Sequence, residues 1–143
     1  MNKKDLIKEL VRVAFSAMVC DSDIDETEKN APILLHGPIA ATWISNNFLN
    51  QIDERIIEAI YFHTTGRANM SDVSKVTFLA DKLDPEKIKR RPSLMDVKPH
   101  IDISLDQAIL KFIELQIDFS NMKNWEIPKM LLEFRDSLLF KNT

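Results

Sequence analysis

The chain has 143 residues, of which 45% are hydrophobic and 29% are charged, and its formal net charge is -3 at pH 7. This length fits one domain, which would bury about two-thirds of the surface that the unfolded chain exposes. The sequence has no excess of basic residues, so nucleic acid is not the expected partner. No apolar run is long enough to span a membrane. The single cysteine, Cys20, excludes an internal disulfide framework, so we expect a reducing, cytoplasmic location.

Helical periodicity dominates the sequence, and only 2 glycines and 6 prolines interrupt it, which predicts an all-α fold. Apolar residues recur at helical spacing after six start signals. In chain order these starts are Asn2 or Asp5, Pro32, Asn50 or Asp53, Ser71, Ser104 and Pro128. The first helix should be about 15 residues long, and the acidic residues 21–30 after it should form a surface connection.

Two of the predicted helices bring a histidine to an element end. In the helix that starts at Pro32, Gly37 and Pro38 indicate a kink or junction beside His36. The next helix should end near His63. Its expected inward-facing residues are Ile56, Ile57 and Ile60.

The helix capped by Ser71 should be closed by Pro85. Its expected apolar stripe is Val73, Val76, Thr77, Ala80 and Leu83. Residues 86–102 contain a basic run that is typical of a solvated segment, and we expect an irregular connection there. Ser104 and Gln107 form a capping box for a long amphipathic helix towards Phe119.

The helix ends carry chemistry that can hold a metal ion. His36, His63 and Asp81 supply two imidazoles and a carboxylate, which are ligand types for iron, manganese or zinc. A lone histidine is more often a core or surface group, so spacing alone is weak evidence. Thr64, Thr65 and Gly66 directly follow His63. Their hydroxyls and glycine backbone could contact phosphate oxygens beside a metal ion held by His63. The alternative for Gly66 is a helix C-cap.

Three ordered blocks of the sequence resemble one family. The blocks are Leu34-Leu35-His36-Gly37-Pro38, then residues 63–71 (HTTGRANMS), then residues 79–85 (LADKLDP). They resemble the YqeK-type branch of the HD-domain phosphohydrolases, which hydrolyse diadenosine tetraphosphate symmetrically. This resemblance implies a single HD-like helical bundle of about six helices over residues 1–143, with the match strongest over residues 33–118.

The resemblance also implies a divalent metal site, with iron or manganese expected and zinc less so. It assigns His36, His63 and Asp81 as ligands and adds Asp21 if the preceding segment is in register. Cys20 stands where the family has the histidine of its His-Asp pair, and no histidine precedes His36. A chain lacking these ligands should have weak or no hydrolytic activity.

Two functions from different classes therefore compete. The first is a metal-dependent hydrolase of nucleotide polyphosphates, with Thr64, Thr65 and Lys82 near phosphate. The second is a non-catalytic nucleotide-binding or interaction module, in which Arg67, Lys82 and Lys87 hold phosphate. Another copy of the chain or a partner protein would supply the missing ligands if hydrolysis is retained. A purely structural role for the blocks does not explain why Thr64, Thr65 and Asp81 are polar.

Overall fold

The structure is a computed structural model that describes residues 32–48 and 50–141. All regular elements in these ranges are helical, which confirms the all-α prediction. They are η1 (Pro32–Leu35), α3 (His36–Asn47), α4 (Glu54–Phe62), α5 (Asp72–Lys82), α6 (Pro85–Arg90), η2 (Pro92–Val97), α7 (Lys98–Ile101), α8 (Leu105–Lys123) and α9 (Lys129–Lys141). The predicted first helix, Cys20 and Asp21 lie outside the described residues.

Side-chain caps fix where three of the predicted helices begin. The Asp53 carboxylate accepts a hydrogen bond from the Arg55 backbone N–H, and the Ser71 and Ser104 hydroxyls accept from the residues three positions later. Each cap satisfies a backbone donor that has no partner within its own helix. These three predicted starts are confirmed, with Asp53 rather than Asn50 as the cap of α4.

The prediction of an irregular connection over residues 86–102 is wrong. Pro85 does not merely close α5, because it opens α6, and η2 and α7 follow. A proline in the first helical turn loses no hydrogen bond, and the Asp84 side chain caps the same turn through the Glu86 N–H. The short helices let the chain turn back towards α8.

The basic run within this segment is also not uniformly solvated. The guanidinium of Arg91 donates to the Gln116 side chain and to the Leu115 carbonyl. It also lies over the ring of Phe119, 4.4 Å from the centroid. Arg91 therefore fastens the segment to α8.

The apolar stripe predicted for α5 is wrong as well. Val73 and Val76 are exposed, and so is Ile56, which we expected to face inward from α4. The buried residues of α5 are Ser74, Lys75, Phe78 and Leu79. Ring packing on Phe112 and Phe134 draws Phe78 inward, and a 2.6 Å ion pair with Asp106 lets Lys75 be buried beside it.

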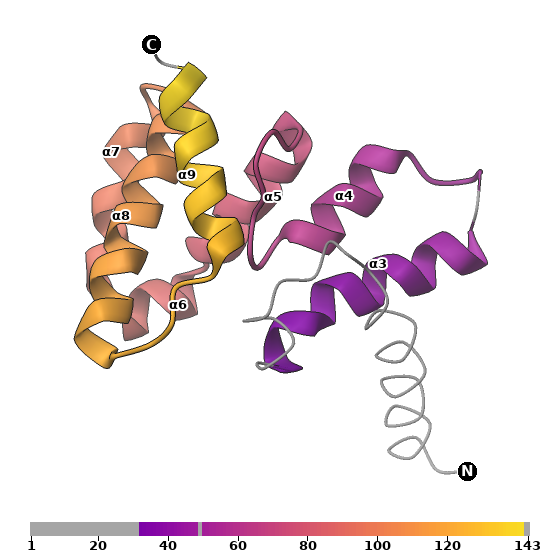
Figure 1. Ribbon diagram of the computed structural model, residues 1–143. Coiled ribbons are helices and arrows are strands. Elements are labelled where there is room, and N and C mark those ends of the chain that lie inside the picture. Colours follow the sequence, from indigo (N-terminus) through magenta and orange to yellow (C-terminus); the bar gives the residue numbers. More distant parts are fainter. Residues whose placement is uncertain (1–31, 49, 142–143) are drawn as a thin grey trace.

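The helices pack in a chain of neighbours that ends in a compact bundle. α3 packs against α4, α4 against α5, and α5 against α8 (Figure 1). η2, α7 and α9 also pack on α8, and α6 packs on η2. The core is formed mainly by α5, α8 and α9, and α4 contributes Phe62. The histidine-bearing ends of α3 and α4 therefore lie at the edge of this bundle.

None of the helices in the described part of the chain has both the length and the hydrophobicity needed to cross a lipid bilayer.

Candidate functional site

A tight turn follows α4 and carries the predicted motif. Gly66 has a φ of +67°, and its N–H donates to the Phe62 carbonyl at 2.8 Å. A Cβ at this position would lie 2.6 Å from the Cδ1 atom of Phe134, so only glycine fits. This is the C-cap geometry that was the alternative for Gly66.

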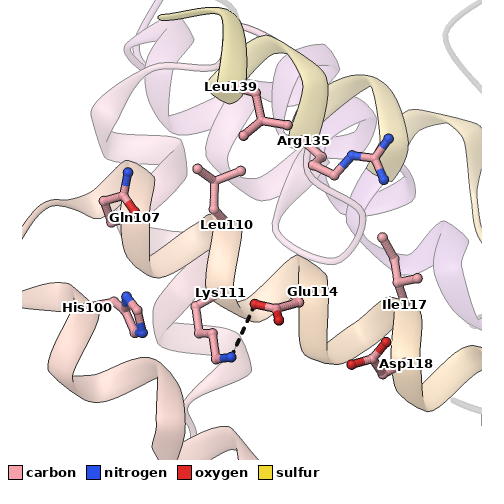
Figure 2. A pocket seen from close by; sticks show the side chains of 9 residues that line it. All are labelled: His100, Gln107, Leu110, Lys111, Glu114, Ile117, Asp118, Arg135 and Leu139. Atoms are coloured by element: carbon pink, nitrogen blue, oxygen red, sulfur yellow. Dashed lines mark hydrogen bonds and ion pairs between the residues drawn. The ribbon is translucent and has the colours of Figure 1, made fainter. Parts of the chain in front are cut away.

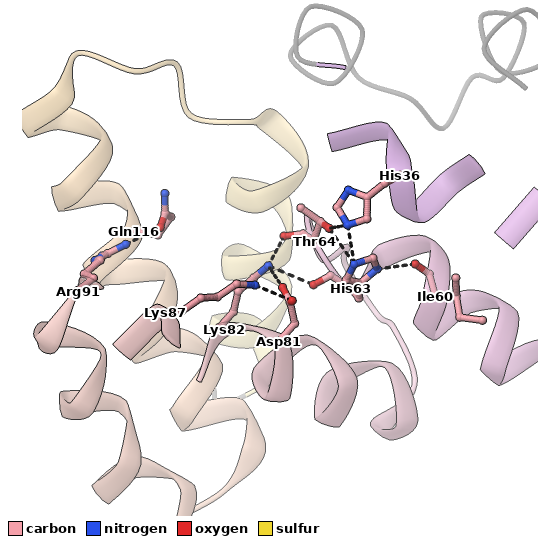
Figure 3. Close-up of polar contacts among 9 residues, drawn as sticks. All are labelled: His36, Ile60, His63, Thr64, Asp81, Lys82, Lys87, Arg91 and Gln116. Carbon is pink, nitrogen blue, oxygen red and sulfur yellow. Dashed lines mark hydrogen bonds and ion pairs between the residues drawn. The ribbon is translucent and has the colours of Figure 1, made fainter. Parts of the chain in front are cut away.

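His36 and His63 face each other across the junction of α3 and α4 (Figure 3). Their Nε2 atoms are 2.8 Å apart, and the Thr64 hydroxyl lies 3.2 Å from each. The two helices approach closely because residue 37 is glycine. A Cβ there would be 2.8 Å from the carbonyl oxygens of Ile60 and Tyr61.

A backbone contact determines the tautomer of this imidazole pair. The Nδ1 atom of His63 is 2.7 Å from the Ile60 carbonyl oxygen, which accepts but cannot donate, so Nδ1 carries the proton. In the neutral ring, Nε2 of His63 is then an acceptor, and His36 is the donor across the 2.8 Å contact.

Asp81 lies beside this turn, where two lysines rather than the imidazoles hold its carboxylate. Its two carboxylate oxygens accept separately from Lys82 at 2.9 Å and from Lys87 at 2.6 Å (Figure 3). Burial raises the pKa of Asp81, but the two ammonium groups outweigh burial and hold the pKa below its ordinary value. Asp81 is therefore an ionised anchor for two lysines.

The side chain of Lys82 is nearly buried, with 12% exposed. Besides Asp81, its ammonium donates to the carbonyl oxygens of His63 at 3.1 Å and Thr64 at 2.8 Å. Burial lowers the pKa of Lys82, and the charge of Asp81 partly offsets this effect. Each of the three N–H donors of the ammonium thus has a protein oxygen as its acceptor.

A cavity of about 280 Å³ opens beside the turn. Its polar lining includes the predicted Thr64, Thr65 and Lys82, together with Lys87. The other lining residues are Leu34, Phe112, Gln116, Pro128 and Leu131. Our sequence analysis did not identify the residues from α8 and the start of α9, because no local motif marks them.

Two other cavities are lined by residues outside this turn. Arg67 lines one of about 430 Å³, where it pairs with Glu58 at 3.3 Å and lies over the Phe62 ring. The other, of about 330 Å³, lies between α8 and α9 and includes His100 (Figure 2). Arg67, which we predicted to lie near phosphate, therefore lines a different cavity from Thr64, Thr65 and Lys82.

The described residues do not by themselves form a metal centre. His36 and His63 present nitrogens close enough to share one ion, since metal–nitrogen bonds of about 2.1 Å place neighbouring ligands about 3 Å apart. However, residues 32–48 and 50–141 contain no group of three or more histidine, cysteine, aspartate or glutamate side chains arranged for a metal. The predicted ligand Asp21 lies outside the described residues.

Comparison with known proteins identifies relatives by sequence, although no family model matches the chain. The chain is 36% identical over 107 residues to a symmetrical bis(5'-nucleosyl)-tetraphosphatase of Halalkalibacterium halodurans, covering 74% of this chain and 56% of the relative. Enzymes of the same name from Bacillus subtilis and Staphylococcus aureus are 32% and 31% identical, over 65% and 64% of this chain and 48% and 46% of theirs. The chain thus spans about half the length of the curated relatives it matches.

A solved structure supports the fold. A protein of Clostridium acetobutylicum, described as a predicted HD superfamily hydrolase involved in NAD metabolism, superimposes with a TM-score of 0.75 and 23% identity. The match covers 94% of this chain and 68% of the other. Together with the sequence matches, it confirms the predicted resemblance. The chain is therefore a relative of the symmetrical bis(5'-nucleosyl)-tetraphosphatases, and it has the helical fold of an HD superfamily hydrolase.

Proposed function

We propose that this chain binds nucleotide polyphosphates in the cavity beside the His63–Thr64 turn, with weak or absent hydrolysis. The observation that carries the proposal is that Thr64 contacts both imidazoles and also lines a cavity that contains two lysines. The named activity of the sequence relatives supports a nucleotide polyphosphate as the ligand class.

Lys87 is the side chain best placed to bind a phosphate group directly. It is 43% exposed, it lines the cavity, and its one hydrogen bond to a described residue is with Asp81. An ammonium has three N–H donors, so two remain for phosphate oxygens. Lys82, which we predicted to lie near phosphate, has its three donors directed at protein oxygens instead.

The proposal of weak hydrolysis follows from the side chains that are available to bind metal ions. Both oxygens of Asp81 are engaged by lysine ammonium groups, and the described residues contribute only the imidazole pair towards an ion. Two-metal hydrolysis needs ions that generate the nucleophile and stabilise the developing charge. The predicted iron or manganese would supply positive charge at the phosphate, with His36 and His63 as its described ligands. To act as the predicted ligand, Asp81 would have to release a lysine, and Asp21 remains a predicted ligand.

Binding and turnover are tested separately. Calorimetric titration with adenosine diphosphate and diadenosine tetraphosphate should show binding. Lys87→Met should weaken it by about 10-fold or more, because a hydrogen bond to a charged group contributes about 1.5–3 kcal/mol. Lys89→Met is the matched control, since Lys89 is exposed on the same helix and does not line the cavity. Equal effects of the two variants would contradict the assignment of Lys87.

Turnover is measured on manganese-loaded protein incubated with diadenosine tetraphosphate, by following adenosine diphosphate release beside His63→Ala. We expect slow or no release. Rapid release that depends on His63 would contradict the weak-hydrolysis proposal. Absence of both binding and release would reject the nucleotide proposal and favour an interaction module.

A further inference from the structure

We infer that Lys82 is a positioning residue for the His63–Thr64 turn and does not contact the ligand. The inference rests on the proposed function only in treating this turn as part of the binding site. It is based on the hydrogen bonds of the nearly buried Lys82 ammonium, whose three donors are all bonded to protein oxygens.

The ammonium holds the end of α4 through backbone atoms. The last carbonyls of a helix have no partner within the helix, and a cation near them interacts favourably with the helix dipole. Lys82 donates to the two carbonyls that directly follow α4, those of His63 and Thr64. Because the same two residues carry the imidazole and the hydroxyl, holding these carbonyls fixes where both functional groups lie.

The surroundings leave Lys82 little freedom to serve a ligand instead. Its Nζ atom lies 4.8 Å from the centroid of the Phe78 ring and 6.0 Å from that of Phe112, both in the core. Asp81 neutralises its charge at 2.9 Å. To bind phosphate, the ammonium would have to abandon a carbonyl or its carboxylate, and a buried oxygen without a partner is costly.

Lys87 provides a matched contrast. It bonds the other oxygen of the same carboxylate, yet no hydrogen bond joins it to the backbone of the turn. Removing either lysine leaves Asp81 with one cation. The two lysines therefore differ in whether they hold the turn, and variants of them separate positioning from simple loss of charge.

The experiment compares Lys82→Met with Lys87→Met by two readouts that need no ligand. Long-range ¹H–¹⁵N spectra of the imidazoles report the contact between His36 and His63, and amide hydrogen exchange at Gly66 reports the turn. We expect Lys82→Met to shift both imidazole spectra and to speed exchange at Gly66 about 10-fold or more relative to α8. Lys87→Met should leave both readouts unchanged. Unchanged imidazole spectra in folded Lys82→Met would overturn the inference.

Two further measurements keep the test decisive if Lys82→Met does not fold. The double variant Asp81→Asn/Lys82→Met removes both charges and should show the same imidazole shifts. In the unmutated protein, the ammonium signal of Lys82 should be detectable through slow proton exchange and should not move during titration with pyrophosphate. Movement at the concentrations where pyrophosphate binds would overturn the inference. Failure of nucleotide binding in the unmutated protein would instead reject the proposed function, because the imidazole readouts do not depend on it.

Discussion

Gly66 shows how one residue decides the geometry of the turn. Its backbone is left-handed, and its Cα packs against the Phe134 ring in the core. A side chain at this position would destabilise the fold in two ways. The left-handed conformation costs a non-glycine residue about 1–2 kcal/mol, and overpacking against the core costs about 1–3 kcal/mol more. Thr64 and the imidazole of His63 therefore depend on a residue that carries no functional group.

We predict that Gly66→Ala lowers the free energy of unfolding by about 2–5 kcal/mol. The measurement is chemical denaturation followed by circular dichroism. The control is Asn69→Gly, because Asn69 also has a positive φ, of 59°, but is exposed. This control should change stability by less than about 1 kcal/mol. A Gly66→Ala protein as stable as the original would show that Phe134 can move away.

At the scale of elements, Glu58 ties α4 to the start of α5. One carboxylate oxygen accepts from the backbone N–H of Ser71 at 3.2 Å and from the Ser74 hydroxyl at 2.9 Å, and the other accepts from Arg67. The loop between these helices contains the His63–Thr64 turn. Glu58 thus holds the loop at one end, while Lys82 holds it at the other.

The pH dependence of stability should report this contact. Burial raises the pKa of Glu58, but the hydrogen bonds from Ser71 and Ser74 and the charge of Arg67 outweigh burial, so the folded pKa lies below its ordinary value of 4.5. The stabilisation is therefore present above about pH 4.5 and is lost as the pH falls through the lowered folded pKa.

We predict that Glu58→Gln lowers stability at pH 7 by about 1–2 kcal/mol and reduces the further loss below about pH 4.5. Denaturant unfolding measured between pH 7 and pH 3 checks both effects. Glu126→Gln serves as the control because Glu126 is exposed between α8 and α9. Parallel pH curves for the original and Glu58→Gln would contradict the role given to this carboxylate.

At the scale of the whole molecule, the sequence predicts local features better than tertiary ones. The caps at Asp53, Ser71 and Ser104 depend on hydrogen bonds between residues at most three positions apart. The local sequence was therefore enough to predict where these helices begin. The buried face of α5 was not predictable from spacing alone, because packing of Phe78 on Phe112 and Phe134 selects it. The role of Lys82 depends on carbonyls 18 and 19 residues away, which no sequence motif encodes.

The arrangement of helices predicts unequal stability across the described chain. Among the described residues, α3 packs chiefly on α4, whereas α5, α8 and α9 share the large core cluster (Figure 1). Segments with few buried apolar contacts open locally at less cost than core helices do. The imidazole of His36 is one of the contacts that hold the start of α3 to the end of α4.

We therefore predict that α3 amides exchange with solvent faster than those of α8, as measured by hydrogen–deuterium exchange. His36→Ala should speed α3 exchange by about 2- to 10-fold, because a hydrogen bond contributes about 0.5–1.5 kcal/mol, and should leave α8 unaffected. Asn46→Ala, at an exposed position of the same helix, should not do so. If manganese bridges the two imidazoles, it should slow α3 exchange in the original chain and have no effect in His36→Ala. Equal protection of α3 and α8 without metal would instead show that α3 opens only when the core unfolds.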